Sequence, residues 1–418
     1  MTRKTSTRRA ALVAAATMTA GVLTGCSANV ASPSDGAITF AYPKASQVLV
    51  WEDMAKKYTQ ETGAEVSVQA IPIDAYSSTL NTRLQGGDAP DLFLTKPGTS
   101  EYGIETLGAS KKLGEITGSA ADLVPSDKTA YEADGTVYGF PLMHVPRAAV
   151  VIDGNLEKTG VTWPTTISEM LADCQATQAE GEAFTLGQFG APFTADGQTL
   201  LVAASSVYAQ DPTWDAQRAA GTVKFSTTEG WRYAVQTVAD MVKANCFQPG
   251  AVAAKGETFQ SVFTGKNPDV ISFATGESDV WKDFSMALKD QTISVRPFPG
   301  QTADTARVIS SVKFTLSYSA ATKNKTAVQK YIDWLTQPAQ QKSIADELGV
   351  PVGQLSADGM TGSYAPLKQL VAEDKVIPTP GETWPAPVLA ALQQDTPGLF
   401  TGQTTVDEIL ADMDAAWK

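Results

Sequence analysis

AITFAY at residues 37–42, AEVSVQAI at 64–71 and DLFL at 91–94 are three short, largely apolar segments of the kind that form buried β-strands. The segments between them, 46–62 and 74–86, carry apolar residues at helical spacing and stop at glycine. This β-α-β-α-β order predicts a mostly parallel sheet covered by helices. In such sheets the ligand crevice lies at the carboxyl ends of the strands.

A second region of alternating helices and strands is expected from about residue 150 to residue 296. Two capping boxes open its helices, because Thr or Ser followed three residues later by Glu satisfies free amides of a first helical turn. These boxes are Thr166-x-x-Glu169 and Ser226-x-x-Glu229. The other expected elements are strands at 270–274, 292–296 and 308–317, a helix at 326–336, and a helical tail whose last segment opens at Thr405-x-x-Glu408.

Composition narrows the classes of function. The 418 residues are 43% hydrophobic and 18% charged, which is typical of a globular protein long enough for two domains. The formal net charge of −13 disfavours nucleic acid and anionic lipid as partners. One histidine and three cysteines argue against a zinc cluster, and the sequence lacks the P-loop, zincin, dinucleotide and nucleophile-elbow motifs. We therefore expect no cofactor, no metal, no nucleic-acid partner and no catalytic activity.

The N-terminus has the pattern of an export signal. Residues 1–25 contain four basic residues and no acid, and an apolar run spans residues 10–23. The run ends in Leu23-Thr24-Gly25-Cys26, which is similar to the bacterial lipobox. We expect cleavage before Cys26, lipidation of its thiol and anchoring to the outer face of the cell membrane, with residues 26–35 as a flexible spacer. The general secretory route is favoured over the twin-arginine route, and cleavage takes the net charge from −13 to −17.

Cys174 and Cys246 remain as an even pair in an oxidising compartment. Each lies at the end of a helical run in the second region. Two helix ends within one domain can meet, so we predict a disulfide between them. The alternative is two separate buried thiols.

Four blocks of sequence, in order, are similar to motifs of the extracellular solute-binding proteins of family 1, the maltose-binding-protein-like receptors of ABC importers. The blocks are Tyr58–Gly63 with Gly87–Leu92, Asp134–Pro141, Ile309–Ser319 continuing through Lys323–Lys325 to Trp334–Thr336 and Pro338, and Thr405–Leu410. Each block alone is a weak match. Four in register behind a lipobox-like segment are specific, and they span nearly all of the mature chain.

This resemblance implies a two-lobe periplasmic-binding-protein fold with three hinge crossings and a helical C-terminal tail. The implied crossings lie near residues 143–149, 295–300 and 349–353. The N-terminal lobe is then 36–146 with 300–349, and the C-terminal lobe 150–297 with 352–418. The implied function is capture of a mono- or oligosaccharide by hinge closure and its delivery to the transmembrane subunits of an ABC permease, by a monomer whose only membrane contact is its lipid anchor.

Ligand contacts are expected from aromatic platforms and from polar side chains near the crossings and strand ends. Trp384 is placed where the family has a sugar-stacking aromatic, and the alternative for it is packing on its own lobe. For His144 and Arg147 the alternative is a hinge hydrogen bond, for Tyr42 core packing, and for Glu277 a solvated acid. The full set of expected contacts is Tyr42, Lys96, His144, Arg147, Phe193, Glu277 and Trp384.

Two departures from the family pattern fall near the expected ligand cleft. Val150-Val151-Ile152 replaces the usual aromatic pair and asparagine, and Glu277 follows Gly276 where relatives often have tryptophan. The ligand class is therefore less firmly implied than the fold. A receptor for a peptide or polyamine and an exported glycoside hydrolase, which needs two carboxylates about 5–9 Å apart, are the alternatives.

Overall fold

The computed structural model describes residues 37–44, 50–98, 100–124, 129–190, 195–255, 258, 261–262, 270–273, 288, 291–349 and 355–418. The expected signal segment 1–25, the spacer 26–35, and the site residues Cys26, Phe193 and Glu277 lie outside the described residues.

The first lobe is built on a six-stranded sheet of order β12-β11-β3-β1-β2, in which β6 pairs with β11. The strands are β1 (Ile38–Lys44), β2 (Val66–Pro72), β3 (Leu92–Thr95), β6 (Phe140–Arg147), β11 (Val308–Tyr318) and β12 (Val376–Pro378). β1 runs parallel to β2 and β3, as the sequence predicts. β11 is antiparallel to β3 and β6, so the sheet is mixed.

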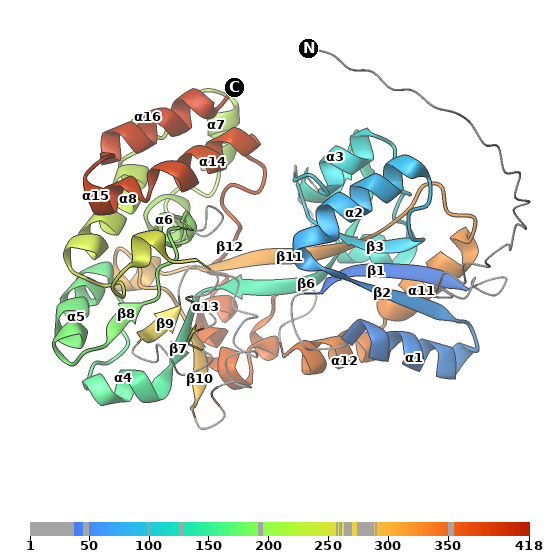
Figure 1. Cartoon of the computed structure of the whole chain (residues 1–418), viewed down its shortest axis with the longest axis horizontal. Helices are drawn as coiled ribbons and strands as arrows, with labels where there is room; N and C mark the ends of the chain where they lie inside the picture. Colours follow the sequence, from blue (N-terminus) through green and yellow to red (C-terminus); the bar gives the residue numbers. More distant parts are fainter. Residues whose placement is uncertain are drawn as a thin grey trace, which may run out of the picture.

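Helices cover both faces of this sheet, with α1 and α12 below it and α2 and α3 above it in Figure 1. They are α1 (Val50–Thr62), α2 (Ile73–Gly86), α3 (Ile104–Ala109), α11 (Lys325–Leu335) and α12 (Pro338–Leu348). Tyr58 of α1 packs edge-on against Tyr331 and Trp334 of α11, at 4.8 and 5.2 Å between ring centroids. Trp334 and Tyr58 are therefore core residues, as their helical spacing indicates. A short hairpin, β4 (Glu132–Ala133) with β5 (Thr136–Val137), precedes β6.

The second lobe has a four-stranded sheet of order β10-β7-β9-β8. The strands are β7 (Ala149–Ile152), β8 (Ala183–Thr185), β9 (Val270–Phe273) and β10 (Ile293–Arg296). Only β8 and β9 are parallel, so the expectation of a mostly parallel sheet is wrong for this lobe. The surrounding helices are α4 (Asp153–Thr159), α5 (Ile167–Ala179), α6 (Gly197–Ala203), α7 (Trp214–Ala219), α8 (Glu229–Lys243), α14 (Ala386–Asp395), α15 (Gly398–Thr401) and α16 (Val406–Ala416), with α13 (Lys368–Ala372) below β11 in Figure 1.

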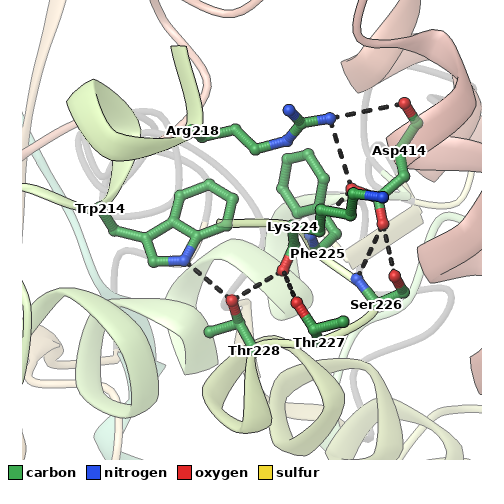
Figure 2. A network of polar contacts seen from close by, with 8 residues as sticks. All are labelled: Trp214, Arg218, Lys224, Phe225, Ser226, Thr227, Thr228 and Asp414. Atoms are coloured by element: carbon green, nitrogen blue, oxygen red, sulfur yellow. Dashed lines mark hydrogen bonds and ion pairs between the residues drawn. The ribbon is translucent and has the colours of Figure 1, made fainter. Parts of the chain in front are cut away.

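The helix starts test the capping boxes directly. Thr166 and Thr405 each form the full reciprocal box with the glutamate three residues later. The box predicted at Ser226 is wrong, because α8 begins after Thr228 and the Ser226 hydroxyl donates instead to Oδ2 of Asp414 at 2.6 Å. Asp414, on α16, also accepts the backbone amides of Phe225 and Ser226 (Figure 2). This carboxylate ties the end of the chain to the turn that precedes α8.

The disulfide between Cys174 and Cys246 is confirmed, with Cα atoms 4.7 Å apart and 72 residues of separation. It joins the last part of α5 to the residues that follow α8. The two helix ends are thereby fixed beside each other.

The structure describes two of the places where the chain passes between the two sheets. β6 ends at Arg147 and β7 begins at Ala149, so only Ala148 separates the two sheets at the first crossing. The second crossing comes later than expected, since Gly300 still pairs with Thr166 of the second lobe. The third, at 349–353, lies outside the described residues apart from Gly349. β12 of the tail pairs with β11, so this part of residues 352–418 belongs to the sheet of the first lobe.

Trp384 is part of the core of the second lobe, and the expectation of an open ring face is corrected. The residue is 1% exposed. Its ring packs against Phe225, Trp231 and Trp417 at 5.1 to 6.1 Å between centroids. Its indole N–H donates to Oδ1 of Asp215 at 3.0 Å. Because aromatic rings surround it on several sides, Trp384 stabilises its own lobe, which is the alternative considered from the sequence.

Trp384→Ala is expected to lower the free energy of unfolding by about 3–5 kcal/mol, because it removes a large buried ring and leaves a cavity. Trp384→Phe keeps most of the packing and loses the hydrogen bond to Asp215, so it should cost only about 1–2 kcal/mol. Urea denaturation measures both. Unchanged stability of the alanine variant together with weakened ligand binding would contradict the core assignment and show that Trp384 contacts the ligand.

Candidate functional site

The candidate site lies where β6 and β11 carry the chain from one lobe to the other. These strands pair from Phe140 opposite Leu316 to Arg147 opposite Ile309. His144 and Ser310 are diagonal neighbours on one face of this ladder, and Nδ1 of His144 lies 3.2 Å from Oγ of Ser310. The structure therefore places both His144 and Arg147 on the strand that leads into the second lobe.

His144 is nearly buried, at 4% exposure. Among the described residues, no group hydrogen-bonds its Nε2 atom. Burial lowers the pKa of His144 from 6.5 to about 4, because a charged imidazole would lose its hydration there. At neutral pH the ring is uncharged, so one of its nitrogens is an acceptor and the other is a donor.

Arg147 lies three residues further along β6, so its side chain is on the opposite face of the ladder from His144. It interacts with Asp196, a buried carboxylate that directly precedes α6. Burial raises the pKa of Asp196, while the charge of Arg147 and a 3.2 Å hydrogen bond from Nε2 of Gln393 lower it. The crossing strand is thus tied electrostatically to α6 and to α14 of the second lobe.

Two buried polar residues next to Asp196 were not identified from the sequence. Gln198 is fully buried, and within the described structure neither its Nε2 nor its Oε1 has a hydrogen-bond partner. Thr199 is 1% exposed and its hydroxyl is equally unpartnered. Each such group costs about 1–3 kcal/mol unless a partner arrives. The signal was present in GQTLLVA at 197–203, where two polar residues open an otherwise apolar helix.

In the first lobe, the predicted contact Tyr42 is buried at 4% exposure. Its hydroxyl donates to Oε1 of Glu52 at 2.8 Å. Burial is the main cause that raises the pKa of Tyr42, and the Glu52 carboxylate raises it further. The other carboxylate oxygen of Glu52 is buried and has no partner in the described part of the chain. Glu52 was not among the predicted site residues.

Lys96 is half-buried and follows β3, and its backbone pairs with Gly103. Two residues later, Gly98 comes against the tail segment between β12 and α14. A Cβ atom added to Gly98 would lie 2.5 Å from the carbonyl oxygen of Glu382. Gly98 has φ of +72°, a conformation that favours glycine. The first lobe and the tail that leads to Trp384 therefore touch here, on a position that admits no side chain.

The predicted site residues that the structure describes do not form one cluster. His144 and Arg147 share the crossing strand, and Lys96 lies near the contact between Gly98 and Glu382. Tyr42 and Trp384 are each buried within the packing of one lobe. In the described part of the chain, no group of three or more His, Cys, Asp or Glu side chains is placed to hold a metal ion.

His144→Gln should change the pH dependence of stability in a defined window. The imidazole has its ordinary pKa near 6.5 when unfolded and about 4 when folded, so the unfolded state binds the proton first. The part of the free energy of unfolding that depends on a neutral His144 is complete above pH 6.5. It falls as the pH drops towards 4, by roughly 3 kcal/mol at 1.36 kcal/mol per pKa unit.

Urea denaturation between pH 7.5 and 4 measures this slope in both proteins. Glutamine keeps polar atoms near Ser310 and does not titrate, so the variant should lose the slope contributed by one proton. Asp196 and Asp215, whose pKa values burial raises, act in the opposite direction and are common to both proteins. Parallel pH curves would contradict the burial of a neutral His144.

Comparison with known proteins supplies the family. Residues 44–342 match the sequence profile of the bacterial extracellular solute-binding proteins. No curated protein sequence matches this chain. Within the described residues, no helix has both the length and the apolarity to cross a membrane.

Solved structures share the two-lobe fold. One, from work on xylan utilization by the thermophilic bacterium Caldanaerobius polysaccharolyticus, has a TM-score of 0.72 and 16% identity over 91% of this chain and 99% of that one. RafE in complex with raffinose has a TM-score of 0.71 and 16% identity over 91% of this chain and 98% of that one. The GacH receptor of Streptomyces glaucescens was solved unliganded and with acarbose. It has a TM-score of 0.68 and 16% identity over 91% of this chain and 97% of that one. At these identities the likeness shows the fold. With the profile match over most of its length, the chain belongs to the bacterial extracellular solute-binding proteins.

Proposed function

We propose that this protein is the substrate-binding lipoprotein of an ABC importer, which captures a mono- or oligosaccharide between its two lobes and delivers it to a membrane permease. The observation that carries the proposal is the family match over residues 44–342 on two separate sheets that are joined where β6 continues through Ala148 into β7. Two lobes linked at a few crossings can close like a hinge. A ligand that contacts both lobes stabilises the closed form by its greater affinity for that form.

The polar groups at the crossing support a ligand rich in hydroxyls. Gln198 and Thr199 offer three polar atoms without partners in the described structure, and Nε2 of His144 is a fourth such atom. Neutral hydroxyls can both donate to and accept from these groups without bringing a charge into a buried place. RafE and GacH, with the same fold, were solved with raffinose and acarbose.

A sugar fits the negative charge of the protein better than an anionic ligand does. The formal net charge is −13, which disfavours an anionic ligand. Peptides and polyamines are the alternative ligands for the same fold. A thermal-shift panel that contains all three classes distinguishes them from sugars.

Saturating ligand should stabilise the protein and make it more compact. At a concentration 100 times the dissociation constant, a bound sugar adds about 2.7 kcal/mol to the free energy of unfolding. A thermal-shift panel of mono- and oligosaccharides, peptides and polyamines identifies the ligand, and small-angle scattering measures the radius of gyration with and without it. A shift with a peptide or polyamine and none with any sugar would overturn the sugar assignment and leave the receptor fold.

A matched pair of glycine variants tests whether closure depends on the contact between Gly98 and the tail segment at Glu382. Gly98→Ala places a methyl group against the Glu382 carbonyl, whereas Gly63→Ala, at a similar φ of +74°, meets nothing within 4 Å. Both variants bear a comparable backbone strain, so only the contact differs. We expect weaker ligand binding and a larger liganded radius of gyration for Gly98→Ala alone. Equal behaviour of the two variants would show that this contact has no part in closure.

Anchoring through Cys26 is the second part of the proposal. The residues Leu23-Thr24-Gly25-Cys26 end the apolar run of the leader, and lipidation with two or three acyl chains would give stable anchoring. Cys26→Ala should leave the leader uncleaved or release the protein from the membrane fraction. Mass spectrometry of the mature natural protein should find the lipid on Cys26. An unmodified mature N-terminus with unchanged membrane partition would contradict it.

A further inference from the structure

A cavity of about 750 Å³ opens in the second lobe, away from the crossing strands. It is lined by the ends of α5 and α8, the loop that follows α8, and α15. Figure 1 shows α5, α8 and α15 on the side of this lobe that faces away from the first lobe. A ligand held here would not bridge the lobes, so the proposed sugar site does not account for this cavity.

The electrostatic character of the cavity is negative. α5 ends at Ala179 and α8 at Lys243, and the C-terminus of a helix carries a partial negative charge that favours cations. Glu182 lines the cavity with a side chain that is only 8% exposed. Its Oε1 lies 3.9 Å from Nζ of Lys158, which is 61% exposed, so solvent screens this pair. The described lining residues include no lysine or arginine.

Aromatic rings form another part of the wall. Phe247 and Phe400 both line the cavity, with ring centroids 5.5 Å apart and planes tilted by 50°. Phe189 lies behind them, 5.0 Å from Phe247 and 4.5 Å from Phe400. The face of an aromatic ring attracts a cation within about 6 Å of its centroid. Aromatic rings and a carboxylate in the wall of the same cavity therefore match an organic cation that carries apolar groups.

The wall of the cavity is held in place before any ligand binds. The Cys174–Cys246 disulfide joins the ends of α5 and α8. The side chain of Gln248, which lines the cavity, accepts from the amide of Gly187 at 2.8 Å and donates to its carbonyl at 2.7 Å. Groups fixed in this way lose little conformational entropy on binding.

We propose that this cavity is a second ligand site, which binds a small quaternary ammonium ion through Glu182 and the rings of Phe247 and Phe400. The carboxylate and the two helix ends supply the negative charge, and the rings take up the alkyl groups around the nitrogen. The site acts independently of the sugar site between the lobes.

Choline and its neutral isostere 3,3-dimethylbutan-1-ol test the proposal on the full mature chain without sugar, with binding followed by NMR titration. The two probes have nearly the same shape and differ in the charge. We expect choline to shift amide resonances around Phe247 and Gly250 and to bind at least tenfold more tightly than the isostere. Equal affinity, or no shift with choline at the highest usable concentration, would overturn the proposal.

Two variants and one matched control locate the site. Glu182→Gln removes the buried charge and should weaken choline binding about tenfold. Glu180→Gln removes an exposed charge two residues away that does not line the cavity, and it should leave the affinity unchanged. Phe400→Leu keeps an apolar side chain and should weaken choline about fivefold. If Glu182→Gln does not fold, the Phe400 variant and the isostere still decide. Loss of the same size in the Glu180 and Glu182 variants would show a general surface attraction and contradict the site.

Discussion

The antiparallel ladder between β6 and β11 is the constraint on which the rest of the structure depends. Both strands belong to the sheet of the first lobe, and β6 continues through Ala148 into the sheet of the second. Paired backbone groups resist bending, since each broken hydrogen bond exposes a donor and an acceptor. Motion between the lobes is therefore expected at the ends of the ladder, where Ala148 and residues 297–307 leave the regular pairing. The irregular register around Phe314 adds a local kink within the ladder.

The second lobe depends on a further long-range interaction, between its helices and the end of the chain. Trp384 and Trp417 enter an aromatic cluster with Phe225 and Trp231. At its edge, the guanidinium of Arg218 lies 4.7 Å from the centre of the Trp417 ring, and Asp414 holds both Arg218 and the turn at Ser226 (Figure 2). Aromatic packing provides the larger stabilisation here, and the carboxylate fixes the geometry of the turn.

Local patterns predicted the elements better than they predicted the site. The Thr166 and Thr405 boxes were read correctly because both partners lie within one helical turn. The Ser226 box has the same spacing, but the serine hydroxyl donates its hydrogen bond to Asp414, 188 residues away in the sequence. A pattern that spans one helical turn cannot predict such a long-range partner. The prediction of an open ring face for Trp384 is wrong for the same reason, since Trp231 and Phe225 surround the residue only after folding. His144 and Arg147 were chosen because they flank the first hinge crossing that the family resemblance implies, whereas Gln198 and Glu52 depend on burial, which spacing does not reveal.

The attachment of α16 to the turn before α8 has a consequence for how the protein is made. Synthesis proceeds from the N-terminus, so Trp231 and Phe225 are translated long before the tryptophans and the carboxylate that complete their surroundings. Neither lobe is continuous in sequence, because the first needs β11 and the second needs residues 384–417. A partly synthesised chain thus has an unfinished core in both lobes. The first lobe completes its sheet only after β12 has been synthesised, and the second lobe completes its aromatic cluster only after Trp417 has been synthesised.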